Sequence, residues 1–130
     1  MYFDKNFPTI PYDSVLLYNV CKLKEGRSFD EVELAIGETC TLTKEMDGFI
    51  AGQVIKYAGF VSEDGTVGDP RNIGVVGNHF GLITYWKSFD DHEKSHKDKA
   101  IKNAFDEVLE VCEQTYELGY EIAWQGEKET

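Results

Sequence analysis

Three features of this 130-residue sequence predict an α+β fold. Four segments carry the apolar pattern of β-strands, and two carry the apolar spacing of helices. Each helix falls between two strands, so the order is β-α-β-β-α-β. That order is the split βαβ or ferredoxin-like arrangement, in which a four-stranded antiparallel sheet carries both helices on one face. The length suits one domain, which we expect at residues 14–125, between an N-terminal arm at 1–13 and a charged tail at 126–130.

The first strand and the first helix are predicted before residue 48. Val15–Leu23 is apolar on both faces, as is typical of a strand that is buried on both sides. Ser28 and Glu31 have the spacing of a capping box, which begins a helix. Apolar residues then follow at helical spacing until Asp47-Gly48, which is a stop signal.

Two further strands are separated by a long connection. We expect Phe49–Val61 to be a strand in which Gly52 and Gly59 mark a bulge, a bend or a close backbone approach. Residues 62–78 are rich in glycine and polar side chains, so we expect either a lid or a surface loop there. His79–Lys87 alternates between its two faces and is the third predicted strand.

The second helix and the last strand complete the predicted fold. Ser88 and Asp91 are spaced as a helix cap, and the best amphipathic part of the helix spans Ile101–Cys112. Tyr116–Trp124 alternates as a strand with one aromatic face. Two helices cover only one face of the sheet, and the other face is also apolar and unfavourable to expose. We therefore expect a symmetric homodimer in which two sheets cover each other.

The composition excludes several classes of protein. A formal net charge of −11 argues against binding to nucleic acids or anionic membranes, because both need clustered Lys and Arg. No apolar run approaches the roughly 18 residues of a membrane span, and no secretory signal is recognisable. Cys21, Cys40 and Cys112 are widely separated and form no C-x-x-C pair, which favours free thiols in a reducing compartment. We expect a cytoplasmic protein.

The motif H-E-x-x-H occurs at His92–His96, after the third strand. Its two histidines are one helical turn apart, so both imidazoles can point into one pocket. On a helix this is the zinc-protease signature. The context argues against it, because Lys94 lies between the two histidines and the extended motif would need a ligand at Lys99.

A third zinc ligand is also hard to find elsewhere in the sequence. Glu113 and Glu117 are far enough downstream, but Glu117 falls in the predicted fourth strand. We therefore predict no metal, with incidental zinc uptake by His92 and His96 left open. Both histidines could also be ordinary polar residues on an amphipathic helix.

Several short segments together resemble a known family. They are Val15-Leu16-Leu17-Tyr18-Asn19, Met46-Asp47-Gly48-Phe49 and Tyr85-Trp86-Lys87-Ser88, followed by a helix with two histidines. In this order they resemble the dimeric α+β barrel superfamily, most closely the antibiotic-biosynthesis-monooxygenase-like proteins and their haem-degrading relatives, over residues 15–124. The resemblance implies a pocket between sheet and helices. It also implies oxidation of polycyclic aromatic quinols without metal or flavin.

The resemblance suggests roles for individual residues. His96, or His92, would take a proton from a phenolic hydroxyl, with His96 preferred because it lies deeper in the predicted helix. Asn19 and Trp86 would position a flat small-molecule substrate. The remaining lining residues of the same cavity would be Tyr57, Phe60 and Tyr85.

Haem and nucleotides are not favoured as ligands. The haem-ligating histidine of the haem-degrading relatives would fall near Phe105, and a pocket tryptophan of that group near Ser95. The glycines of residues 65–77 match neither the Walker phosphate-binding loop nor the G-x-G-x-x-G dinucleotide-binding motif. Two structural alternatives stay open, namely a backbone hydrogen bond for Asn19 and a core position for Trp86. A non-catalytic, small-molecule-binding dimeric barrel is the alternative function, so enzymatic activity itself stays open.

Overall fold

The computed structural model describes residues 9–59, 64–65, 67–68 and 78–129. Within these, the sheet contains β1 (Val15–Leu23), β2 (Phe49–Lys56), β3 (His79–Trp86) and β4 (Cys112–Glu121). Its strand order is β2-β3-β1-β4, and every neighbouring pair is antiparallel. β1 is therefore a central strand, with β3 on one side and β4 on the other. The predicted ferredoxin-like α+β fold is confirmed.

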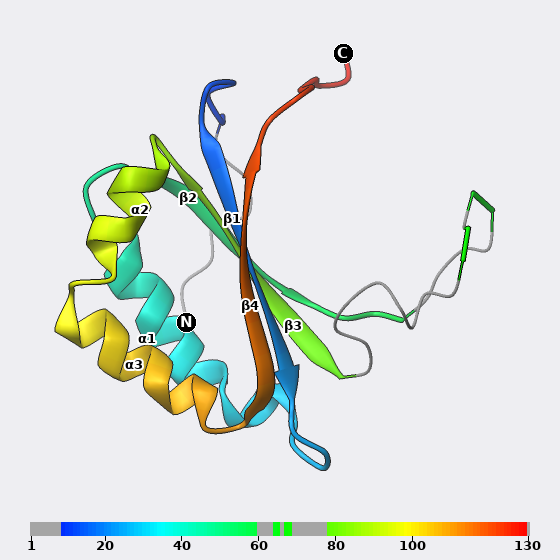
Figure 1. Ribbon diagram of the computed structural model, residues 1–130, viewed down its shortest axis with the longest axis vertical. Coiled ribbons are helices and arrows are strands. Elements are labelled where there is room, and N and C mark those ends of the chain that lie inside the picture. The colour runs from blue at the N-terminus through cyan, green and yellow to red at the C-terminus, as the bar shows by residue number, and fades with distance from the viewer. Residues whose placement is uncertain (1–8, 60–63, 66, 69–77, 130) are drawn as a thin grey trace.

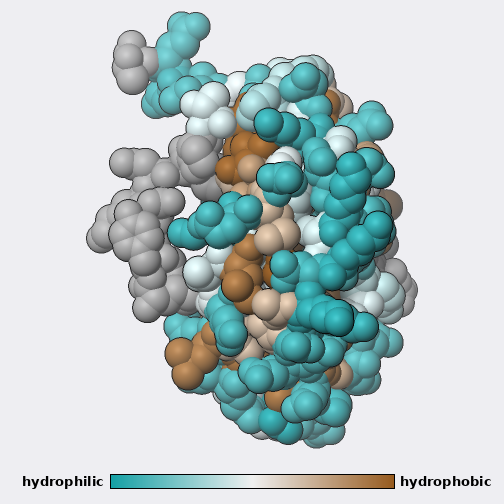
Figure 2. Space-filling model, turned by 90° about the vertical axis from the view of Figure 1, so that its left-hand side faces the viewer, coloured by the Kyte–Doolittle hydropathy of each residue, from teal (hydrophilic) through white to brown (hydrophobic). Residues whose placement is uncertain are grey.

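All the helices of the described part lie on one side of this sheet (Figure 1). They are the 3₁₀ turn η1 (Phe29–Glu31), α1 (Glu33–Thr43), α2 (Phe89–Ser95) and α3 (Lys99–Leu109). None of the helices described is long and apolar enough to cross a bilayer. Seen from the helix side, the surface is mainly hydrophilic, with a narrow hydrophobic band down its middle (Figure 2).

The second predicted helix is in fact two helices. The chain leaves the helical path between α2 and α3, because Asp98 adopts an extended backbone and its carboxylate accepts a hydrogen bond from the Ile101 backbone N–H at 2.9 Å. This cap starts a new helix. The last strand also differs from the prediction. Cys112 belongs to β4 and not to the helix, and β4 ends at Glu121 rather than Trp124.

The start of the first helix differs less. The Glu31 carboxylate accepts a hydrogen bond from the Ser28 backbone N–H at 2.7 Å, as predicted. These residues frame a single 3₁₀ turn, however, and α1 begins only at Glu33. At the other end, Gly48 has a φ of +84°, and an added Cβ there would lie 2.5 Å from the Asp91 side chain. The turn before β2 is therefore packed tightly against α2.

The core lies between the sheet and the helices. β1 contributes Cys21 and Leu23, and β3 contributes Phe80 and Leu82. The other buried members are Val32, Ile36, Val108, Val111 and Cys112. Because alternate residues of a strand point to opposite faces, Asn19 is on the same, helix-covered face as Cys21.

The opposite sheet face has no helix over it (Figure 1). It carries several large apolar side chains that are more than one-third exposed, namely Ile55, Tyr57, Tyr116, Leu118 and Tyr120. Val20, Tyr18 and Leu16 pair with the last three of these across β1 and β4. The described face is therefore apolar, as expected.

Several predictions fall partly outside the described residues. Phe60, residues 1–8 and most of the connection at 62–78 are among them. In the described part of the arm, the Tyr12 hydroxyl donates a hydrogen bond to the Ala123 carbonyl at 2.9 Å. The Gln125 amide likewise donates to the Ile10 carbonyl at 2.7 Å. The segments before β1 and after β4 are thus joined to each other.

Candidate functional site

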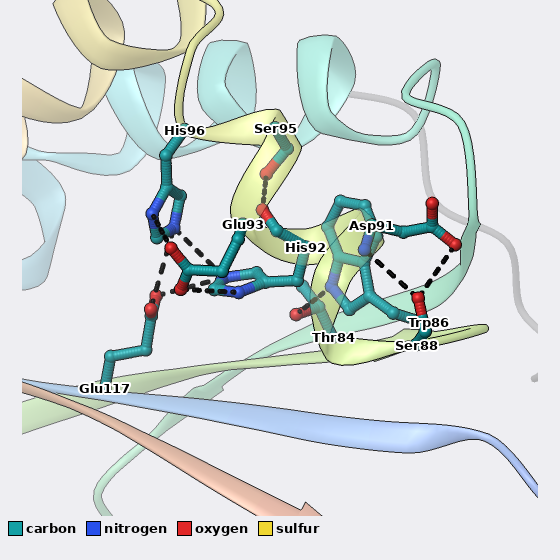
Figure 3. Close-up of polar contacts among 9 residues, drawn as sticks. All are labelled: Thr84, Trp86, Ser88, Asp91, His92, Glu93, Ser95, His96 and Glu117. Carbon is teal, nitrogen blue, oxygen red and sulfur yellow. Dashed lines mark hydrogen bonds and ion pairs between the residues drawn. The ribbon is translucent and has the colours of Figure 1, made fainter.

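His92 is held between α2 and the sheet. α2 begins at the predicted cap, where the Ser88 hydroxyl accepts a hydrogen bond from the Asp91 backbone N–H at 3.1 Å. One turn later, the His92 side chain is only 7% exposed and packs edge-to-face with the Trp86 ring at a centroid distance of 5.5 Å. The Trp86 ring is fixed in turn, because its Nε1 donates to Thr84 Oγ1 at 2.8 Å (Figure 3).

His96 lies beside His92, as the four-residue spacing predicts. The two Nε2 atoms are 3.1 Å apart, and the ring centroids are 4.4 Å apart. The expectation that His96 lies deeper in the helix than His92 is wrong, however. His96 is the residue that follows the last turn of α2, and its side chain is 47% exposed. It is therefore the more accessible of the two imidazoles, not the deeper one.

Glu117 completes the cluster from the sheet. It lies on β4 opposite Asn19 of β1, with its side chain toward α2. Its Oε2 is 3.2 Å from His92 Nε2, and its Oε1 is 3.6 Å from His96 Nε2 (Figure 3). The strand position that argued against Glu117 as a partner of the histidines is what brings it to them.

Glu117 is electrostatically suited to these partners. Partial burial by itself raises the pKa of the Glu117 carboxyl. The hydrogen bond with His92 and the charges of His92 and His96 lower it, and a hydrogen bond from the Asn19 side chain adds to this effect. The result is a pKa below the usual value of a glutamate, so Glu117 is an anion near neutral pH. Asn19 therefore joins the cluster through Glu117.

Glu93 is the fourth polar residue of the cluster. One of its oxygens is 3.8 Å from His92 Nδ1, and the other is 3.8 Å from His96 Nδ1. Together, His92, Glu93, His96 and Glu117 offer ligand atoms that all lie within 4.8 Å of one another. Lys94 points away and pairs with Asp90 at 3.3 Å, so a charged residue inside the motif does not prevent the burial of His92.

Trp86 and the residues expected near a haem are core residues. Trp86 is completely buried, so it supports His92 from behind. Phe105 packs against the core and offers no ligand atom to a haem iron. Ser95 is buried, and its hydroxyl donates to the His92 carbonyl at 2.6 Å. These residues do not fit a haem site.

Tyr57 and Tyr85 do not join the cluster, so the expectation of one shared cavity is wrong for both. Tyr85 alternates with the inward-facing Trp86 and therefore faces the open side of the sheet. Tyr57 stacks on His79 at a centroid distance of 4.4 Å. It lines a hollow of about 220 Å³ with Tyr18, Ile55, Lys56, Ala58, His79 and Gly81, and this hollow too is on the open face.

Reasoning from sequence set Glu117 aside as a ligand because it falls in a strand, although one signal favoured it. Glu117 and Gly119 form the polar face of the last strand, which contrasts with its aromatic face. In the βαββαβ order, the aromatic face matches the open side of the sheet, so the polar face lies under the helices. A carboxylate on that face needs a cationic or hydrogen-bonding partner, and the histidine pair is near.

No family model and no curated protein matches this chain in sequence. Its fold is similar to that of solved structures, including SnoaB from Streptomyces nogalater, described as a cofactor-independent oxygenase. SnoaB has a TM-score of 0.62 and 14% identity over 90% of this chain and 99% of its own. Hydroxynitrile lyase from Passiflora edulis has a TM-score of 0.64 and 14% identity over 90% of this chain and 100% of its own. A dimeric ferredoxin-like protein of unknown function from Thermobifida fusca has a TM-score of 0.62 and 8% identity, covering 87% and 94%.

These similarities confirm, at the level of fold, the resemblance to antibiotic-biosynthesis-monooxygenase-like proteins. An oxygenase and a lyase both have this fold. The fold therefore does not select a reaction, and function has to be argued from the site.

Proposed function

We propose that this chain is a cofactor-independent monooxygenase that acts as a homodimer on a flat, quinol-type aromatic molecule, with His96 as its base. The observation that carries the proposal is the convergence of His96, His92 and Glu117 between α2 and the sheet. This is the region where the pocket is expected from the resemblance. The fold shared with SnoaB, described as a cofactor-independent oxygenase, adds support.

His96 is the better base because a substrate can reach it. Its side chain is 47% exposed, whereas that of His92 is 7% exposed. A neutral imidazole accepts the phenolic proton, and the resulting cation is stabilised by the anionic Glu117 at 3.6 Å. A general base of this kind accelerates a reaction by about 10²–10⁴-fold. Asn19 acts on Glu117, so we assign it a positioning role.

The proposed reaction uses the electrons of the substrate itself. Loss of the phenolic proton to His96 leaves an electron-rich anion, which passes one electron to O₂. The substrate radical and superoxide then combine and form a C–O bond at the ring carbon para to the phenolic oxygen, which carries one hydrogen in the phenol form. The resulting peroxide anion takes back the proton held by His96. The peroxide loses water and leaves a carbonyl group. One oxygen atom enters the product and the other leaves as water, so no external reductant is needed.

The partner in this proposal is a second copy of the chain. The open face exposes aromatic and aliphatic side chains on β4 that no helix of the described part covers. The Thermobifida fusca neighbour, which has the same fold, is described as dimeric. A second sheet on this face would remove that apolar surface from water.

A non-catalytic, ligand-binding dimer is the second candidate. One observation favours it, because the hollow lined by Tyr57 and His79 is on the open face and away from the His96 cluster. An aromatic ligand held there would not contact the proposed base.

Oxygen consumption separates the two candidates. Chelator-treated, tag-free protein is mixed with a simple anthrone, and O₂ uptake is followed for wild type and for His96→Ala, His92→Ala and Lys94→Ala. Lys94 is the matched control, because it lies in the same motif and points to solvent. We expect kcat/KM to fall about 10²-fold or more in His96→Ala and to stay unchanged in Lys94→Ala. Equal uptake by wild type and both histidine variants would remove the histidines from the mechanism.

A further inference from the structure

We propose that His92, His96 and Glu117 form a binding site for one divalent transition-metal ion, with Zn²⁺ as the best-matched ion. The ion would bind reversibly and would compete with the base role of His96. The metal site stands on its own geometry, and only the expected inhibition rests on the proposed oxygenase function.

The distances in the cluster fit chelation. The two Nε2 atoms are 3.1 Å apart, His92 Nε2 is 3.2 Å from Glu117 Oε2, and His96 Nε2 is 3.6 Å from the other carboxylate oxygen, Glu117 Oε1. Two ligand atoms at about 2.0–2.1 Å from a tetrahedral Zn²⁺ are about 3.3–3.4 Å apart. Each imidazole nitrogen therefore has the other imidazole nitrogen and one oxygen of Glu117 within a few tenths of an ångström of this spacing, and one ligand atom from each residue of the cluster lies within 4.8 Å of the others.

The same atoms are poorly satisfied without a cation. Two facing Nε2 atoms can share only one proton in a hydrogen bond, and an ionised Glu117 can only accept hydrogen bonds. The two Nε2 atoms and the Glu117 carboxylate therefore offer more acceptor lone pairs than there are N–H protons to donate to them. A divalent cation accepts one lone pair from each ligand at once.

Glu93 lies close to both imidazoles. Glu93 approaches the Nδ1 atoms of both imidazoles at 3.8 Å, on the side of each ring away from Nε2. These distances are too long for hydrogen bonds, so Glu93 contributes negative charge beside the two rings rather than a fixed contact.

The cluster is prepared for binding and open to solvent on one side. The Trp86 ring and the capped start of α2 hold His92, so little order has to be gained when an ion binds. His96 is half-exposed, which leaves room for a water molecule as the fourth ligand of an open Zn²⁺ site. Glu93 and Glu117 give the cluster two negative charges that a divalent ion neutralises.

Metal binding and base catalysis use the same electron pair. When an ion is bound to Nε2 of His96, that lone pair can no longer accept the substrate proton. Glu117 is then also bound to the ion and no longer stabilises a protonated His96. Zn²⁺ would therefore inhibit the proposed oxygenase, and a chelator would restore its activity.

Binding is tested on tag-free, chelator-treated full-length protein, first by titration calorimetry and native mass spectrometry with ZnCl₂. Co²⁺ then serves as a spectroscopic probe of the coordination geometry. We expect one Zn²⁺ per chain and visible Co²⁺ bands of tetrahedral intensity. His96→Ala and Glu117→Gln should each weaken binding at least about tenfold, and circular dichroism checks that both fold. Lys94→Ala should bind as wild type does.

The site is disproved if wild type binds no Zn²⁺, or if His96→Ala and Glu117→Gln bind as tightly as wild type. The failures of the two proposals are distinguishable. Zn²⁺ binding without O₂ uptake by the metal-free protein would end the oxygenase proposal and leave the metal site standing. O₂ uptake without Zn²⁺ binding would end the metal-site proposal and leave the oxygenase proposal standing.

Discussion

Trp86 connects the protein core to the polar cluster. Its side chain is completely buried, and its ring meets Phe49 edge-on at 5.4 Å and His92 edge-on at 5.5 Å. The indole Nε1 also donates to Thr84 Oγ1. The same side chain therefore contributes to stability and fixes the position of one imidazole.

Replacing Trp86 should affect both properties. We expect Trp86→Ala to lower the free energy of unfolding by about 3–5 kcal/mol, because it removes a buried aromatic side chain and leaves a cavity. Trp86→Phe keeps a ring but loses the hydrogen bond to Thr84, so its effect should be smaller. Urea unfolding followed by circular dichroism measures both. A loss of less than about 1 kcal/mol in Trp86→Ala would contradict this packing role.

The residues of the site differ in how far the sequence predicts them. His92 and His96 follow from their four-residue spacing, and Asn19 is conspicuous as an amide on an apolar strand. Glu117 cannot be assigned from local patterns, because its position depends on pairing between the first and last strands of the sheet. The sequence also did not predict which of the two histidines is accessible, because no residue before Asp98 signals the end of α2.

At the scale of elements, the start of the first helix depends on one carboxylate. The hydrogen bond from the Ser28 backbone N–H lowers the pKa of Glu31, slight burial opposes this, and the Arg27 side chain at 2.8 Å lowers the pKa further. A pKa that is lower in the folded state means that ionised Glu31 stabilises the fold. This contribution is complete above the unfolded-state pKa of about 4.3 and is lost as the pH falls through the lower folded-state value.

Glu31→Gln tests this pH dependence. The variant should be less stable than wild type at pH 7, because a neutral amide binds the Ser28 N–H and Arg27 more weakly. The difference in unfolding free energy should shrink as the pH falls from about 5 to 3. Thermal unfolding of both proteins across this range measures it. A difference that stays constant with pH would show that the charge of Glu31 does not matter.

The elements themselves were largely predictable. β1 and β3 follow from their apolar pattern, and the caps at Ser28 and Ser88 follow from side-chain chemistry that acts over three residues. The break between α2 and α3 was missed because the polar segment around it also suits a helix surface. A local aspartate cap overrides that pattern, and its signal is Asp98 three residues before the apolar Ile101.

At the scale of the whole molecule, the account requires the apolar sheet face to be covered. Leu118 lies midway along the edge strand β4 on this face and is 43% exposed, whereas Leu34 lies on α1 and is 90% exposed. Placing a charge at Leu118 should prevent a second copy from packing there, and the same change at Leu34 should have no effect on assembly.

Sedimentation of Leu118→Glu and Leu34→Glu tests this. We expect wild type and Leu34→Glu to be dimers at micromolar concentration and Leu118→Glu to be a monomer that keeps its circular dichroism spectrum. A monomeric wild type, or a Leu118→Glu variant that dimerises as wild type does, would show that the face is not the interface between copies.

The central claim is that His96, which follows α2, and Glu117, which lies on β4, act as one functional unit. A double-mutant cycle tests this most directly, with the kcat/KM of O₂ uptake measured for chelator-treated wild type, His96→Ala, Glu117→Gln and the double variant. If the two residues act together, the double variant should be no slower than the slower single variant. If the two losses multiply, or if neither single change slows the reaction, the cluster is not the site of the chemistry.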